Sequence, residues 1–331
     1  MSLSFLRSIG TVSNIFLAAL GGLLLAGVAC VAYGVFIERR WYRLATYRLE
    51  LLPEKASSFT VLHLSDLHLV RSDRKKAAFI ATLPSADVTV VTGDLIGEPS
   101  AVEALVAAIR PVRGRVASYF VLGSNDYFAP SPRNYLAYFR RKRRHRLGVP
   151  GRSGDLIAQL EGEGWQHLPN RQVDLTVGGI RTQVVGLDDP HIERHDLRAA
   201  VGRDAGAFGL ALMHSPDPAP ELAALGYELI LAGHTHGGQV RMPLVGALVT
   251  NGTTPTKLCM GLSRIGPAVM HVSPGLGTSK YAPFRFLCRP EATLLELTPV
   301  PEGAAVSRRD WVGTGRRSET APAFQPETAS S

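Results

Sequence analysis

Short apolar runs alternate with helical patterns through the middle of the 331-residue chain. The apolar runs lie at 59–65, 87–93 and 118–124, and helical patterns at 74–83 and 99–109 separate them. This alternation predicts an α/β domain. Each run ends in a polar turn, and open α/β sheets gather their functional groups at the carboxyl ends of the strands. We therefore expect the functional side chains of the protein to lie in those turns.

The later part of the chain continues the alternation. The pattern at 155–163 predicts a helix, and 173–189 predicts a hairpin that turns at Gly178-Gly179. Four more strands with their turns are expected at 208–216, 227–238, 268–275 and 292–299. No internal repeat is visible, so the pattern indicates one domain.

The N-terminal pattern is different, since no charged residue occurs between positions 8 and 37. The apolar run 15–37 is long enough, as a helix, to cross a hydrocarbon core about 30 Å thick. A cleaved signal peptide has a shorter apolar run and a small-residue cleavage site, whereas this run continues directly into charged residues from Glu38 onward. We therefore predict one uncleaved transmembrane helix, preceded by a short segment at 1–14.

The distribution of arginines predicts the orientation of that helix. The span is followed by Arg39, Arg40, Arg43 and Arg48, and Arg7 is the charged side chain before it. By the positive-inside tendency, the bulk of the chain lies in the cytoplasm. The start of the chain has no twin-arginine pair, which removes one route for export of a folded domain. We predict a single-pass protein of the cell membrane with a cytoplasmic catalytic domain.

Changes in composition mark the other boundaries. A juxtamembrane connector at 38–58, with an edge strand at 47–52, leads into a domain at 59–300. An aromatic and basic insertion interrupts that domain at 127–154. The segment 301–331 is rich in Ser, Thr, Ala, Pro, Gly and Arg without apolar periodicity, which predicts a disordered tail.

Composition limits the classes of protein and site. Hydrophobic residues make up 45% of the chain and charged residues 19%, which excludes a wholly disordered protein. The three cysteines, Cys30, Cys259 and Cys288, lie far apart, which excludes a disulfide scaffold and a cysteine-rich zinc module. Any metal must therefore be held by His and Asp. The formal net charge of +8 suits anionic lipid and nucleic acid equally.

Five short polar signals follow one another along the chain, each at or just after the end of an expected strand. They are Asp66-x-His68, Gly93-Asp94, Gly123-Ser124-Asn125-Asp126, His214 and Gly233-His234-Thr235-His236. Two side chains two positions apart lie on one side of an extended backbone, so a carboxylate and an imidazole can meet one cation. The set offers ligands for a pair of divalent ions that share a carboxylate, and such a pair activates water for attack on phosphorus.

The ordered set resembles the signature of the calcineurin-like metallophosphoesterases, which is D-x-H, G-D, G-N-H-D, H and G-H-x-H. Flanking segments at 186–190, 231–240 and 273–285 resemble its bacterial membrane-anchored branch, similar to YkuE and YaeI. The likeness covers about 59–298 and implies a four-layer α/β/β/α sandwich of two mixed sheets, here preceded by the transmembrane helix. It also implies two divalent metal ions, such as Mn, Fe or Zn.

The resemblance gives metal-binding roles to six residues, and Asn125, from the motif that departs from the pattern, is the seventh candidate ligand. The first ion would be held by Asp66, His68 and His236, with Asp94 bridging the two ions. The second ion would be held by Asn125, His214 and His234. The residues expected to be catalytic are Asp94, Asn125, His214 and His234.

One motif departs from the family pattern. In strict register with Gly-Asn-His-Asp, Ser124 replaces the ligand and Asn125 replaces the histidine, whereas a one-residue adjustment keeps Asn125 as the ligand. We prefer Asn125, because an amide oxygen is a better neutral ligand than a hydroxyl for a hard cation. Either register leaves no imidazole at the leaving-group position, so Asp126 or a metal-bound water would have to supply the general acid.

The sequence therefore predicts a membrane-anchored, dinuclear metal-dependent phosphoesterase that hydrolyses a phosphodiester or a phosphomonoester, including lipid esters, by metal-activated water. The basic run at 140–146 is expected to lie against the headgroups of an anionic leaflet. Nucleic acid competes for the same patch, which makes a nuclease-like phosphodiesterase the alternative enzyme. A low-turnover metal-binding membrane module is the third interpretation, which the missing histidine supports.

Other polar residues near the motifs have simpler interpretations. His63 and His271 lie on expected strands and are predicted to be core or supporting residues. The segment 188–191 is able to line the cleft, but a β-turn capped by its carboxylates explains it equally well, so it is not counted among the catalytic residues.

Overall fold

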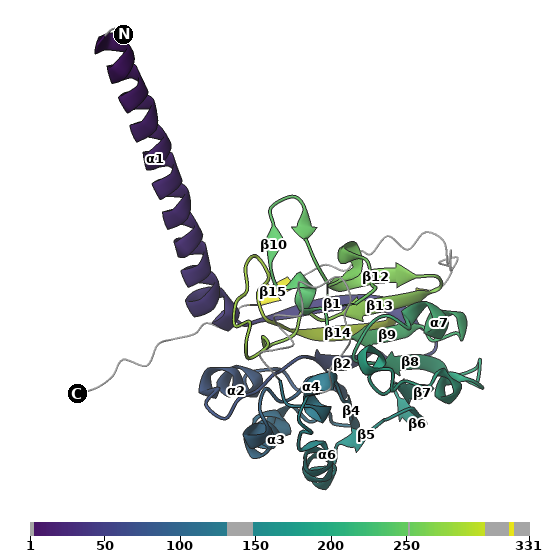
Figure 1. The fold of residues 1–331 in the computed structure, drawn as a ribbon. Coiled ribbons are helices and arrows are strands. Elements are labelled where there is room, and N and C mark those ends of the chain that lie inside the picture. The colour runs from purple at the N-terminus through teal and green to yellow at the C-terminus, as the bar shows by residue number, and fades with distance from the viewer. Residues whose placement is uncertain (1–2, 131–147, 251, 302–317, 321–331) are drawn as a thin grey trace.

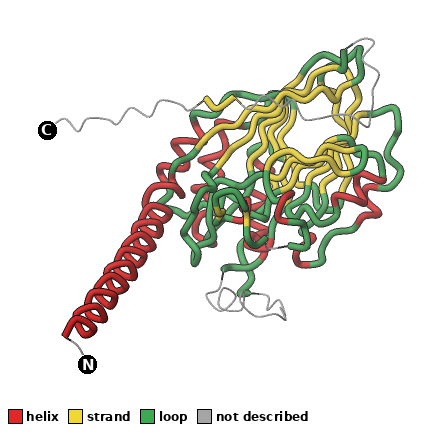
Figure 2. The backbone as a smooth tube through the Cα atoms, turned by 90° about the horizontal axis from the view of Figure 1, so that it is seen from above, coloured by secondary structure: helices red, strands yellow, loops and turns green. Residues whose placement is uncertain are grey.

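The computed structural model describes residues 3–130, 148–250, 252–301 and 318–320. Two β-sheets pack face to face, and a long N-terminal helix leaves the domain at one side (Figure 1). Seen from above, the strands gather in the middle and helices lie outside them (Figure 2). The predicted four-layer α/β/β/α architecture is confirmed. The predicted basic run at 140–146 lies outside the described residues.

The first sheet is mixed and has the order β15-β1-β14-β2-β3-β4-β5. Strands β2 to β5 are parallel to one another, while β14 is antiparallel to β2 and parallel to β1. Its strands are β1 (Arg43–Leu52), β2 (Phe59–Leu64), β3 (Val88–Thr92), β4 (Ala117–Val121), β5 (Gln166–His167), β14 (Glu291–Pro299) and β15 (Ser318–Thr320).

The second sheet has the order β12-β13-β9-β8-β7-β6. Its four central strands are parallel, and the edge strands β6 and β12 run antiparallel to their neighbours. The β6–β7 hairpin turns at Gly178 and Gly179, both of which have positive φ, as predicted. The strands are β6 (Arg171–Val177), β7 (Ile180–Gly186), β8 (Phe208–Leu212), β9 (Leu229–Ala232), β12 (Gly261–Ile265) and β13 (Ala268–Val272). A separate two-stranded ribbon pairs β10 (Arg241–Met242) with β11 (Gly246–Ala247).

Three apolar clusters join the four layers. One lies between the sheets and includes Val61, Val90, Leu210 and Leu231. The other two bury the outer sheet faces under helices. The helices of the domain are α2 (Arg74–Ala81), α3 (Val102–Ile109), α4 (Ser124–Tyr127), α6 (Ser153–Gly162) and α7 (Ala219–Ala224). Short 3₁₀ turns lie at Pro99–Ala101, Arg110–Val112, Pro190–Ile192, Leu197–Ala200, His236–Gly238 and Thr256–Leu258.

The N-terminal helix α1 (Leu3–Ala32) continues into a π-helical turn, Tyr33–Ile37, and a 3₁₀ turn, Glu38–Arg40. Its segment Phe16–Arg40 has a mean hydropathy of 2.2 over its most apolar window, and only 6% of that window is buried. By length and composition this helix is able to cross a membrane.

The connector that follows α1 is more ordered than the sequence suggested. Strand β1 begins at Arg43 rather than at 47, and it is not an edge strand. It pairs with β14 on one side and, through Leu44–Thr46, with β15 on the other. The strand β15 comes from the segment expected to be a disordered tail, a pairing too distant in sequence for local patterning to reveal. The rest of that segment beyond Pro301 lies outside the described residues.

Candidate metal centre

The carboxyl ends of five strands deliver the predicted ligands to one place. Strands β2, β3 and β4 are adjacent in the first sheet, and β8 and β9 are adjacent in the second. The predicted ligands that follow these strands are Asp66 and His68 after β2, Asp94 after β3, Asn125 after β4, His214 after β8, and His234 and His236 after β9. The fold therefore gathers all seven where the sequence expected them.

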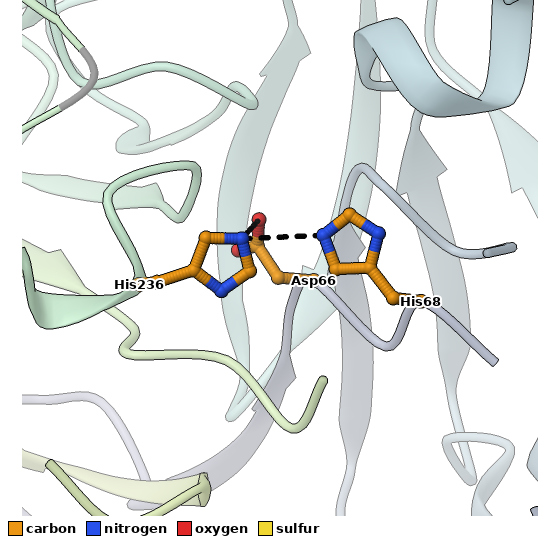
Figure 3. Close-up of side chains that lie close together, drawn as sticks. All are labelled: Asp66, His68 and His236. Carbon is orange, nitrogen blue, oxygen red and sulfur yellow. Dashed lines mark hydrogen bonds and ion pairs between the residues drawn. The ribbon is translucent and has the colours of Figure 1, made fainter. Parts of the chain in front are cut away.

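Three of these residues form one compact group, shown in Figure 3. The Nε2 atoms of His68 and His236 are 3.2 Å apart, and Nε2 of His236 lies 3.6 Å from Oδ1 of Asp66. All three side chains are buried. Two imidazole nitrogens at this separation are each able to lie about 2.1 Å from one ion, the usual zinc–nitrogen distance.

Asp94 connects this group to a second one. Its Oδ2 lies 3.4 Å from Nε2 of His68, and its Oδ1 lies 3.6 Å from Nε2 of His214. Asp66, Asp94 and His214 also converge as a set with their ligand atoms within 4.8 Å of one another. Nδ1 of His234 is 3.1 Å from Nε2 of His214. One carboxylate thus faces histidines of both groups, which is the arrangement a bridging ligand requires.

Hydrogen bonds leave one oxygen of Asp66 free for a cation. The Ser65 hydroxyl and the His234 backbone N–H both donate to Oδ2 of Asp66, at 2.6 and 2.9 Å. Oδ1 of Asp66, the oxygen that faces His236, is buried and has no hydrogen-bond partner among the described residues. A buried polar atom without a partner is costly, and a cation would remove that cost. The donor set of carboxylates and imidazoles therefore fits a divalent metal.

The backbone at these positions is strained. Positive φ angles, between 38° and 67°, occur at Asp66, His68, Asp94, His234 and His236. Each such residue costs on the order of 1–3 kcal/mol, and such strain is concentrated at functional sites. Backbone hydrogen bonds between the loops stabilise this strained conformation. For example, the His68 N–H donates to the Asp94 carbonyl at 2.9 Å.

Burial sets the protonation of three of the histidines. It lowers the pKa of His68 to about 4 and lowers the pKa values of His234 and His236 well below the ordinary value. These imidazoles are therefore neutral at pH 7, the form that binds metals. Burial likewise raises the pKa of Asp66 to about 6.

His214 and Asp94 shift each other's pKa values. Burial opposes the charge of His214, yet the neighbouring carboxylates, Asp94 foremost, raise its pKa to about 9. Burial would raise the pKa of Asp94, but His214, His68 and hydrogen bonds from Asn125 hold it below its ordinary value. His214 Nδ1 lies 2.9 Å from the Thr92 carbonyl oxygen, which can only accept, so Nδ1 carries a proton and Nε2 faces Asp94.

The altered Gly-Ser-Asn-Asp loop has a defined structure. The Asn125 backbone N–H donates to Oδ1 of Asp94 at 2.9 Å, and its amide nitrogen donates to Oδ2. Asp126 accepts three backbone N–H bonds, from Leu95, Ile96 and Gly123, at 2.8–3.0 Å. Both oxygens of Asp126 are thus committed to holding two loops together, and this residue is not placed to assist a leaving group.

The 188–191 segment, for which the sequence left a cleft-lining role and a simple turn equally open, packs against the proposed ligands. It is a turn, since Oδ1 of Asp189 accepts the His191 N–H at 2.8 Å. Asp189 is also fully buried, and burial raises its pKa to about 7. The ring of His191 lies 4.3 Å, centroid to centroid, from that of His234. The flanking sequence Gly-Leu-Asp-Asp-Pro was the available signal.

His63 and His271 are buried between the sheets, as predicted. Their Nδ1 atoms are 2.9 Å apart, and Nε2 of His63 lies 2.8 Å from the hydroxyl of Thr92. Thr92 is the residue whose carbonyl orients His214. The His63–His271 pair therefore helps to position Thr92, and Thr92 in turn positions His214.

Comparison with known proteins agrees with this geometry. Residues 59–238, more than half of the chain, match the calcineurin-like phosphoesterase family. The chain is 25% identical over 262 residues to the uncharacterized metallophosphoesterase YkuE of Bacillus subtilis, covering 76% of this chain and 83% of YkuE. It is 26% identical over 271 residues to the phosphodiesterase YaeI of Escherichia coli, covering 80% and 92%. A Bos taurus transmembrane protein with a metallophosphoesterase domain is 28% identical over 273 residues, covering 76% of this chain and 55% of that protein. The chain belongs to the calcineurin-like phosphoesterase family and is a metal-dependent phosphoester hydrolase.

Proposed function

We propose that this protein is a membrane-anchored phosphoesterase that uses two divalent metal ions to hydrolyse a phosphodiester or phosphomonoester carried by a lipid. The observation that carries the dinuclear assignment is the position of Asp94, whose two oxygens face His68 and His214 separately. A carboxylate shared in this way is the usual bridge of a two-metal site.

The proposed ligand sets follow from the same distances. The proposed ligands of the first ion are Asp66, His68 and His236, and Asp94 is a ligand that the two ions would share. His214 and His234 hold the second ion. Asn125 would complete the second set through its amide oxygen, and in the structure its amide nitrogen donates to Asp94. When bound, the ions supply Lewis acidity toward the phosphoryl oxygens and lower the pKa of water.

Side chains that are not metal ligands orient the ligands and assist the leaving group. Thr92 fixes the ring of His214, and Ser65 fixes the carboxylate of Asp66, so the atoms that face the ions are preorganised. To His191, whose ring lies 4.3 Å from that of His234, we assign the donation of a hydrogen bond to the leaving-group oxygen. It thereby occupies the role of the histidine that the Gly-Ser-Asn-Asp loop lacks.

Membrane anchoring is supported by the exposed apolar helix α1 and by the relatives named as transmembrane proteins. The arginines that follow the helix favour a catalytic domain on the cytoplasmic side of the cell membrane. An anchored active site meets lipid-borne phosphate esters at high local concentration, which favours them as substrates.

The proposal is tested on the full chain in detergent micelles, stripped of metal and resupplied with Mn²⁺ or Zn²⁺. We expect metal-dependent hydrolysis of an aryl phosphodiester or of the matching monoester. Asp94→Asn should lower the rate at least about 100-fold, because it removes the charge shared by the two ions. Asp174→Asn, a change at an exposed position on β6, is the matched control. Equal rates for both variants would contradict the proposal.

A further inference from the structure

The β10–β11 hairpin carries an exposed apolar surface next to the end of α1. In the 241–249 hairpin, Leu244 is fully exposed, and Val245 and Leu248 are 70% and 57% exposed. Met242 and Val249 are also exposed, and no charged residue occurs from 242 to 249. Contiguous exposed apolar side chains of this kind mark an interaction surface rather than an ordinary loop.

Backbone contacts connect this hairpin to the end of the N-terminal helix. The Arg241 N–H donates to the Phe286 carbonyl at 2.9 Å, and the Phe286 N–H donates to the Gln239 carbonyl at 3.0 Å. The ring of Phe286 lies edge-on to that of Tyr33, with centroids 6.3 Å apart. In Figure 1, α1 and the hairpin project from the same side of the domain. The hairpin is therefore adjacent to the point where a membrane crossed by α1 would begin.

The end of α1 is fixed to the domain rather than joined by a loose linker. The buried carboxylate of Glu38 accepts the backbone N–H groups of Leu287 and Cys288. A Cβ at Gly34 would lie 2.2 Å from the ring of Phe284, so only glycine allows the helix to pack this closely. The direction of α1 thus determines which face of the domain meets the bilayer.

That face also carries positive charge. A cavity of about 530 Å³ opens between the helix end and the hairpin, and three arginines, Arg43, Arg241 and Arg289, line it together with one acidic residue, Glu38. Arg43 pairs with Glu291, and Arg289 stacks on the exposed Trp41 at 4.1 Å. Arginine and tryptophan beside apolar residues are typical of the headgroup region of an anionic leaflet.

We propose that the 241–249 hairpin inserts its apolar tip into the anionic bilayer that α1 crosses, as a second membrane contact. The inference rests on the proposed anchoring through α1. It places the segment that begins five residues after His236 in the membrane interface, so the loop that bears this metal ligand is held close to lipid headgroups. The occupant is the bilayer because the hairpin is joined to the end of the membrane helix through Phe286 and Tyr33 and because Arg241 lies at its base.

The test uses the full chain with Cys30→Ser in nanodiscs that contain phosphatidylglycerol and lipids with doxyl quenchers at two depths, near the headgroup and near the middle of the bilayer. Cys259 and Cys288 are buried, so the environment-sensitive fluorophore is attached to one introduced cysteine per variant. The variants are Leu244→Cys, Leu24→Cys within α1, and Val201→Cys on the domain surface, where the residue is 62% exposed. We expect the labels at 244 and 24 to lose about half their emission or more, as shallowly and deeply inserted groups do, and the label at 201 to lose none.

The three labels separate the possible failures. Quenching at 24 without quenching at 244 would overturn the hairpin contact and leave the anchoring intact. No quenching at 24 would overturn both. A label at 244 that is shielded from water yet unquenched would indicate contact with a protein, such as a second copy, and would also overturn the proposal. Hydrolysis of a soluble aryl phosphodiester by the same samples reports separately on the proposed function.

Discussion

The guanidinium of Arg285 lies 3.4 Å from Nδ1 of His236, at a position with no solvent exposure. It donates hydrogen bonds of 2.6 Å to the carbonyl oxygens of Pro274 and Gly277, and further ones to Gly275 and Cys288. One buried cation therefore organises the loop that follows β13 and the segment on which α1 is docked. It does so beside a proposed ligand of the first metal ion.

Replacing Arg285 by Met is expected to destabilise the protein strongly, because several buried carbonyl groups lose their donor. Each unsatisfied group costs about 1–3 kcal/mol, so we expect a loss of at least about 3 kcal/mol and a clearly lower melting temperature. Arg285→Lys should lose less stability, since lysine keeps the positive charge, although it lacks the planar guanidinium group that donates several hydrogen bonds in fixed directions. Arg171→Met, a change at an exposed position, serves as control. Equal melting temperatures for Arg285→Met and the control would refute this assignment.

Ser65→Ala tests the preorganisation of Asp66. Without the 2.6 Å hydrogen bond, the carboxylate is held only by the His234 backbone N–H, and metal affinity should fall about 10–100-fold, the usual effect of removing a residue that orients a ligand. Competition with a chelator measures the affinity. The matched control is Ser118→Ala, a buried serine whose hydroxyl accepts the Gly114 N–H. The interpretation fails if both variants bind metal as tightly as the parent.

His191→Ala tests the source of leaving-group assistance. Esters with alkyl leaving groups need such assistance, whereas nitrophenyl esters leave readily without it. We therefore expect the variant to lose about 100-fold in kcat with an alkyl ester and much less with a nitrophenyl ester. His195→Ala, in the same loop, is the control. A loss of the same size with both esters would instead indicate a purely structural role.

The order of strands and helices could be predicted from the sequence because apolar periodicity is local. The ligands could be found for the same reason, since Asp66-x-His68 and His234-x-His236 are each contiguous and stand at strand ends. The contacts of Arg285 with the 273–277 loop and the pairing of β15 with β1 depend on tertiary placement, which local patterning does not encode.

The place of Asp189 in the site likewise depends on tertiary packing that local sequence does not encode. Its sequence context is fully explained by a turn, and the structure contains that turn. Only the packing of the turn against His234 shows that a buried carboxylate and a second imidazole stand next to the proposed ligands. In the Gly-Ser-Asn-Asp loop it is likewise tertiary contact that shows the two nitrogen atoms of Asn125 donating to Asp94, and the role of Asn125 as a metal ligand stays a proposal.

The most direct test of the central claim is a titration of the metal-free full chain with Mn²⁺ or Zn²⁺, in which bound metal and hydrolysis of an aryl phosphodiester are measured on the same samples. The account predicts that activity rises until two ions are bound per chain and is abolished when a chelator removes them. Full activity with one bound ion, or hydrolysis by the metal-free chain, would contradict it.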